Sequence, residues 1–205
     1  MYFLKTATVF ILSLQTALIT AQSASLVRSY IKSERKVAEN ISPLVETLNY
    51  HLEVEEWMPV FRKVIAGTNA LTRGLKLAER RFGEKLPVFD AVDATEIEAD
   101  FLSFADEAVN VLATFTRKTR PAAAAQEEIS KLALQPFTNL ENALKTYIKK
   151  LLKTIPSASD ALYISTQLIQ DEVGGLVLIF EESVGTGPSI VVDGSHAGKI
   201  KIIIK

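Results

Sequence analysis

The apolar residues of this sequence recur every three or four positions over most of its length, which is the period of an amphipathic α-helix. The widest apolar side lies between Asp93 and Arg120. Asp93 is placed to cap this helix together with Glu96, and Pro121 is expected to stop it. Because so wide an apolar side must be covered, we expect the other segments to pack around it. Its apolar positions are Ile97, Phe101, Phe104, Ala105, Ala108, Val109, Val111, Leu112 and Phe115.

Two helical segments are predicted before this central helix. The first covers residues 26–52 and contains Pro43. It is either one long helix kinked at Pro43 or two helices, the second of which is capped by Ser42. The second segment follows a break around residues 57–59 and runs over 61–82.

Two more segments follow the central helix. Residues 122–155 are predicted as one long helix bent at Pro136 or as two short helices. The last helix is expected to start at a cap, Ser157 or Ser159, and to continue to Val184. Together the segments predict an all-α fold, an antiparallel bundle of about five helices over residues 24–185.

Four glycines lie inside the predicted helices. Gly67 and Gly74 are seven positions apart in one helix, and Gly174 and Gly175 are adjacent in another. A glycine inside a helix costs about 1 kcal/mol relative to alanine, so each needs a packing or functional reason. For Gly67 and Gly74 the alternatives are the close approach of another helix, which we favour, and space left for a ligand.

The two ends of the chain depart from the helical pattern. Residues 1–23 have a lysine, an apolar run over 7–19 and a small-x-small ending, as in a secretory signal peptide. The alternative is a retained N-terminal helix, and neither this run nor any other is long enough to span a membrane. Residues 186–205 form a separate tail, with two β-prone runs around a turn. The tail is either a hairpin docked on the bundle or disordered.

Composition narrows the class of protein. The chain is 48% hydrophobic and 23% charged, with a formal net charge of −1, which is typical of a globular protein. Its basic residues are scattered along the helices, so nucleic acid is not an expected partner. Cysteine is absent, which excludes disulfides, thiol catalysis and thiolate metal sites.

Residues that could support catalysis or metal binding are few. His51 and Glu55 are one helical turn apart, but two ligands without a third indicate a surface pair. Asp193, Ser195 and His196 have the residue types of a hydrolase triad, yet within one short loop they cannot form its relay and indicate a turn. We therefore expect no enzyme, no cofactor and no metal site.

The apolar interior is the remaining candidate site. Amphipathic helices of this kind either pack solidly or leave a pocket that an acyl chain can enter. The candidate lining residues lie near the middle of the helices on their inward sides. They are Leu71, Phe101, Phe104, Ala108, Leu112, Leu144, Ile148, Ile169, Val173 and Phe180.

The order of these segments resembles the fungal hydrophobic surface-binding protein A family, which includes cell-wall galactomannoproteins. The stretch 93–118 is similar to that family's central helix, and 137–152 and 162–184 are similar to the helices that follow. The resemblance covers residues 24–184. It implies a secreted helical protein, in or near the cell wall, that holds fatty acids or adsorbs to hydrophobic surfaces without catalysis.

Two functional hypotheses follow. In the first, the bundle is a secreted, non-enzymatic protein that binds a fatty acid, another hydrophobic ligand or a hydrophobic surface. In the second, it is a structural or adhesive cell-wall mannoprotein without a small-molecule ligand, glycosylated at Asn40 in the sequon Asn40-Ile41-Ser42.

Overall fold

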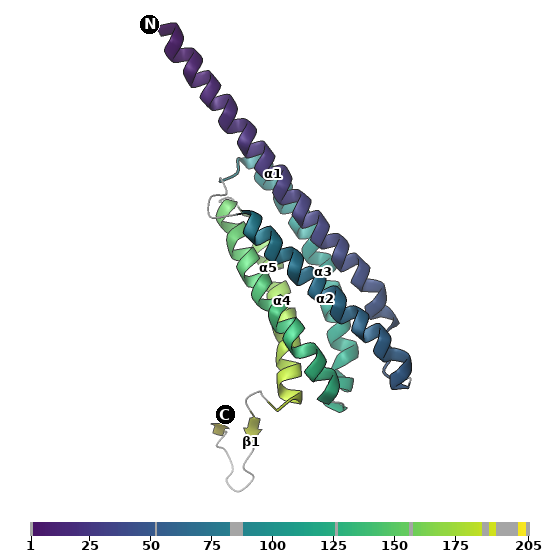
Figure 1. Ribbon diagram of the computed structural model, residues 1–205. Coiled ribbons are helices and arrows are strands. Elements are labelled where there is room, and N and C mark those ends of the chain that lie inside the picture. The colour runs from purple at the N-terminus through teal and green to yellow at the C-terminus, as the bar shows by residue number, and fades with distance from the viewer. Residues whose placement is uncertain are drawn as a thin grey trace.

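The computed structural model confirms the all-α fold class, with five helices in the described part of the chain (Figure 1). It describes residues 2–51, 53–82, 88–125, 127–155, 158–185, 189–191 and 201–203, with side chains described between 23 and 185 except at 124 and 125. Successive helices run in opposite directions, as predicted for an antiparallel bundle. They are α1 (Tyr2–Thr47), α2 (Val54–Phe82), α3 (Ala91–Ala125), α4 (Glu127–Thr154) and α5 (Asp160–Ser183).

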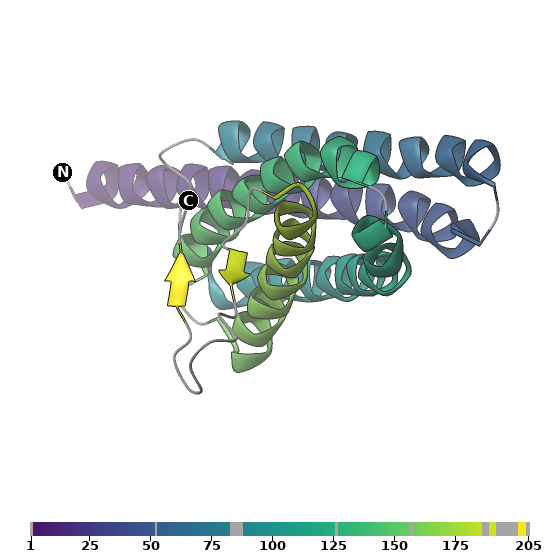
Figure 2. The ribbon, with the colours of Figure 1, turned by 90° about the horizontal axis from the view of Figure 1, so that it is seen from below.

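The helices pack in a closed ring, in the order α1, α2, α4, α5, α3 and back to α1 (Figure 2). A weaker contact between α3 and α4 crosses the ring. It divides the bundle into a four-helix part, made of α1, α2, α4 and α3, and a three-helix part, made of α3, α4 and α5. The pairs α1–α4 and α2–α3 face each other across the four-helix part, so side chains alone fill its centre.

Proline breaks fewer helices than the sequence predicts. Pro43, Pro59, Pro121 and Pro136 all lie inside helices. The predicted break at 57–59 and the predicted stop at Pro121 are therefore wrong, and α1 and α4 are each one long helix. Pro43, Pro59 and Pro121 are exposed and Pro136 is partly exposed, so water is at hand for the backbone carbonyls that lose a partner.

The caps of the later helices explain their boundaries. Oδ1 of Asp90 accepts hydrogen bonds from the backbone N–H groups of Val92, at 3.0 Å, and Asp93, at 2.9 Å. Asp90, and not Asp93, is thus the cap of α3. Of the two predicted caps of α5, Ser159 is the one used, because its hydroxyl accepts from the backbone N–H of Leu162.

The two glycines of α2 lie where α1 approaches closely, as favoured from the sequence. A Cβ atom at Gly67 would lie 2.6 Å from Cγ1 of Ile41, and one at Gly74 would lie 2.6 Å from Cδ of Glu34. No such neighbour exists at Gly175, where a Cβ would meet nothing within 4 Å. Close helix packing therefore explains the glycines of α2 but not those of α5.

Both terminal segments extend beyond the five packed helices (Figure 1). The first part of α1 extends beyond the other helices in Figure 1. Strands β1 (Ser189–Val191) and β2 (Lys201–Ile203) pair antiparallel in the tail, with Ile190 opposite Ile202. Among the described residues, no helix is both long enough and apolar enough to cross a membrane.

Candidate functional site

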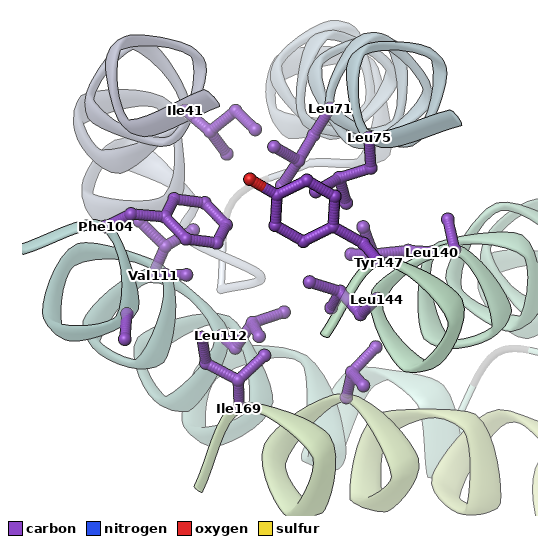
Figure 3. Close-up of a cluster of buried hydrophobic side chains, with 14 of the residues drawn as sticks. Ile41, Leu71, Leu75, Phe104, Val111, Leu112, Leu140, Leu144, Tyr147 and Ile169 are labelled. Atoms are coloured by element: carbon purple, nitrogen blue, oxygen red, sulfur yellow. The ribbon is translucent and has the colours of Figure 1, made fainter. Parts of the chain in front are cut away.

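A buried apolar cavity lies in the four-helix part of the bundle (Figure 3). Each of the four helices contributes at least three side chains, and every lining residue is buried. Thr68 supplies the only polar side chain, and its hydroxyl donates to the carbonyl of Val64 at 3.0 Å. The wall is therefore apolar in effect. It consists of Ala38, Ile41, Val45, Val64, Thr68, Leu71, Phe104, Ala108, Val111, Leu112, Phe115, Phe137, Leu140 and Leu144.

The cavity is small in this conformation. The space open to the centre of a water-sized sphere is about 20 Å³, and about 10–15 Å³ is needed to hold one water molecule. An apolar void of this size has no hydrogen-bonding partners for water in its wall. The cavity is thus a gap between side chains that an acyl chain would have to widen.

Aromatic rings connect the cavity to the rest of the core. Phe115 and Phe137 are both in its wall and stack with their ring centroids 5.2 Å apart. Phe61 stacks on Phe115 at 6.1 Å, and Phe180 lies 5.6 Å from Phe137. This row of rings joins α2, α3, α4 and α5, so any widening of the cavity must leave it intact or displace several helices together.

Two polar side chains are buried one helical turn away from the cavity wall. Glu34 precedes the lining residue Ala38 by four positions on α1, and Tyr147 follows Leu144 by three on α4. The side chain of Glu34 is 2% exposed and that of Tyr147 is 0% exposed. In Figure 3 the Tyr147 hydroxyl points away from its own helix, toward Leu71 and Ile41.

Neither polar group has a protein partner that satisfies it. Oε2 of Glu34 and the hydroxyl of Tyr147 are buried without a hydrogen-bond partner among the described residues. Burial raises the pKa of Glu34 to about 7. Burial, with the nearby Glu34 carboxylate as a second cause, also raises the pKa of Tyr147 above its ordinary value. The pair therefore places a hydrogen-bond donor and an acceptor, both buried and unpaired, beside an apolar cavity.

The ten candidate lining residues are all buried, but they do not all meet. Five of them line the cavity: Leu71, Phe104, Ala108, Leu112 and Leu144. Phe101, Ile148, Ile169, Val173 and Phe180 lie in the core outside its wall, and the last three belong to α5 in the three-helix part. Helical periodicity identifies which side of a helix is inward, but it cannot tell which part of the core retains space.

The other candidate sites gain no support. His51 is exposed in the turn after α1, and Glu55 is exposed in the first turn of α2. No cluster of metal-binding side chains occurs among the described residues. The loop with Asp193, Ser195 and His196 lies outside the described residues. Asn40 is exposed on α1, where the sequon stays a prediction.

Comparisons with known proteins support the fold. A crystal structure of Afmp4p in complex with palmitic acid superimposes with a TM-score of 0.53, over 77% of this chain and 99% of that chain. The two sequences are 16% identical, so the similarity is one of fold. No protein-family model matches the sequence, and no curated protein does either.

Proposed function

We propose that this protein binds a single-chain lipid, a fatty acid above all, in the cavity between α1, α2, α3 and α4. The observation that carries the proposal is an apolar cavity enclosed by four helices, in a fold shared with a protein crystallised with palmitic acid. The cavity wall offers no free hydrogen-bonding group to a ligand. It therefore favours a hydrocarbon chain over a polar metabolite.

Binding must widen the cavity. Ligand pockets measure about 300–1,000 Å³, whereas this cavity offers about 20 Å³ to a water-sized sphere. The ring arrangement makes such widening feasible, since α1 and α4, and likewise α2 and α3, lie opposite each other and meet only through side chains, as Phe61 and Phe115 do. We therefore expect association to be slower than diffusion, because it waits for the helices to separate.

Filling the cavity tests the proposal. Ala108→Leu places three extra carbons in the cavity wall, whereas Ala105→Leu adds the same atoms to the same helix at a buried position outside the wall. Delipidated protein is offered palmitic acid and examined by native mass spectrometry, with helical circular dichroism as the check on folding. We expect uptake by the parent protein and by Ala105→Leu, and at least tenfold weaker binding by Ala108→Leu.

Two results would contradict the proposal. The first is a parent protein that is isolated without lipid and takes up none. The second is equal binding by Ala105→Leu and Ala108→Leu, which would place the lipid elsewhere in the molecule.

We also propose that the protein is secreted and acts without catalysis. Residues 1–23 have the pattern of a signal peptide, and Ala24 and Val27, which follow them on α1, are buried in the core. Cleavage after Ser23 would thus leave these packed residues of α1 in the mature protein. N-terminal sequencing of protein from the culture medium tests this, and an intact first residue there would refute it.

Adsorption to hydrophobic surfaces is a second candidate function, favoured by α5. This helix exposes Tyr163, Ile164, Leu168 and Leu178, each about half accessible to solvent. If α5 is the adsorbing face, Ile164→Gln combined with Leu168→Gln will reduce retention on alkyl-coated beads and leave palmitic acid uptake unchanged. Unchanged retention would remove this candidate.

A further inference from the structure

The buried residues Glu34 and Tyr147 form a polar pair that the apolar cavity alone does not explain, and among the described residues the Ser130 hydroxyl is the other buried side-chain group without a partner. An unsatisfied buried polar atom costs about 1–3 kcal/mol, and each residue of this pair has one, close enough for the Glu34 charge to raise the pKa of Tyr147. Replacing both with apolar residues would remove that cost. Their position one turn from the cavity wall, on α1 and on α4, suggests a use for them in ligand binding.

The chain makes room for this pair. Glu34 lies against Gly74 of α2, where even a methyl group would overlap its carboxyl group. Gly74 follows the lining residue Leu71 by three positions, so α2 also reaches the pair within one turn of the cavity. On α1, α2 and α4 the last residue of the cavity wall is thus followed, one turn or about 5 Å further along the bundle, by a residue of this cluster.

The charges around the pair leave it electrically isolated. Tyr147 is the titratable group that faces Glu34 from α4, and it carries no charge at neutral pH. On α2 the basic residues next to Gly74, Arg73 and Lys76, are exposed. On the side of α3, Asp100 binds Arg28 at 2.7 Å and Lys32 at 3.5 Å. Among the described residues no cation therefore neutralises Glu34, and a second negative charge beside it would be strongly unfavourable.

We propose that Glu34 and Tyr147 hold the polar end of the bound lipid, and that a fatty acid binds there through a carboxyl group that shares one proton with Glu34. This inference rests on the lipid-binding function proposed above. One carboxyl oxygen of the lipid pairs with Glu34 through the shared proton, and the Tyr147 hydroxyl donates to the other. The hydrocarbon chain then extends into the cavity.

The shared proton predicts how the affinity for a fatty acid depends on pH. Below pH 7 the protein already holds the proton on Glu34, so an ionised fatty acid binds without proton uptake. Above pH 7 both carboxyl groups are ionised when free, and the complex must take up one proton. The dissociation constant for the acid should then rise about tenfold for each further pH unit. A fatty alcohol donates to the Glu34 carboxylate without needing that proton, so its affinity should stay nearly constant.

The experiment compares decanoic acid with 1-decanol, by calorimetric titration between pH 5.5 and 9. The variants are Glu34→Gln and Tyr147→Phe, with Glu39→Gln and Tyr30→Phe as controls on α1. In the parent protein and in both controls we expect the acid alone to weaken tenfold per unit above pH 7. Glu34→Gln should abolish this slope, because its amide donates to the ligand at every pH. Tyr147→Phe should weaken both ligands about tenfold and keep the slope.

The outcomes separate this inference from the proposed function. If neither ligand binds the parent protein, lipid binding itself is refuted, and the inference falls with it. If both ligands bind but Glu34→Gln retains the slope of the parent, or the acid shows no slope, the inference is overturned while lipid binding stands. If Tyr147→Phe leaves the affinity for both ligands unchanged, the role of the pair is likewise overturned. The unsatisfied atoms of Glu34 and Tyr147 would then bind water and not the lipid.

Discussion

The glycines of α2 and α5 allow the same substitution to be tested in two opposite environments. Gly67→Ala adds a methyl group 2.6 Å from Cγ1 and 3.1 Å from Cδ1 of Ile41, in the contact between α1 and α2. Gly175→Ala adds the same group to α5, where nothing lies within 4 Å. Both residues are inside helices, so the intrinsic gain in helix propensity is the same for the two variants.

The two variants should therefore differ by the cost of overpacking alone. Replacing a helical glycine by alanine stabilises a helix by about 1 kcal/mol. We expect this gain in full for Gly175→Ala. At Gly67 the added methyl must push α1 away or force Ile41 out of its rotamer, at a cost of about 1–3 kcal/mol. Gly67→Ala should then be neutral or destabilising by up to about 2 kcal/mol, which is the difference between these two terms.

Urea unfolding followed by circular dichroism measures both free energies of unfolding. The slope of the free energy of unfolding against urea concentration must be the same in all variants for the comparison to hold. Ile41→Ala removes the atoms that the new methyl would meet, so in that background Gly67→Ala should recover about 1 kcal/mol or more. Equal stabilisation by Gly67→Ala and Gly175→Ala in the parent background would refute the close approach of α1 and α2.

Three further predictions concern single residues. Burial raises the pKa of Glu34 to about 7, whereas the carboxyl group in the unfolded chain loses its proton near pH 4.5. The free energy of unfolding should therefore fall by about 3 kcal/mol between pH 4.5 and 7 and stay level above pH 7. Glu34→Gln should remove that fall in urea titrations at pH 5 and 8, and a parent protein as stable at pH 8 as at pH 5 would contradict this. Trp57 is the only tryptophan and is 2% exposed, so its fluorescence should shift to the red on unfolding, and acrylamide should quench the folded protein little. Tyr50→Phe removes a 2.9 Å hydrogen bond to the buried Thr119 and should lower the free energy of unfolding by about 1–3 kcal/mol; an unchanged urea midpoint would refute it.

The sequence predicts the helices well because each apolar stripe is long and in phase. It fails at particular prolines. From the sequence Pro121 is indistinguishable from a helix stop, yet α3 continues to Ala125, because Phe115, Thr119 and Ala122 remain on one buried side. Whether a proline ends a helix depends on whether the carbonyl four residues before it, which loses its N–H partner, can reach solvent, and only the packed structure determines this.

The candidate site is predicted less completely. The apolar stripes include residues of α2, α3 and α4 that line the cavity, such as Leu71, Ala108 and Leu144, and also residues of α5 that are buried in the same core outside the cavity wall. The residues next to Glu34 do not indicate that it is buried, because most of them are charged and favour a solvent-exposed side of the helix. One available signal is the spacing of Gly67 and Gly74, which matches the spacing of Ile41 and Glu34 on α1.

Gly74 and Glu34 are each unfavourable when considered alone. A glycine in the middle of α2 weakens that helix by about 1 kcal/mol, and a buried carboxyl group without a partner weakens the folded state at neutral pH. Together they fit, because the missing side chain of Gly74 leaves the space that the Glu34 carboxyl occupies. Departures from local rules that depend on each other in this way concentrate at functional sites, where stability and binding make opposing demands. Their position beside the apolar cavity is therefore the strongest reason to look for the polar end of the proposed ligand there and not at the surface.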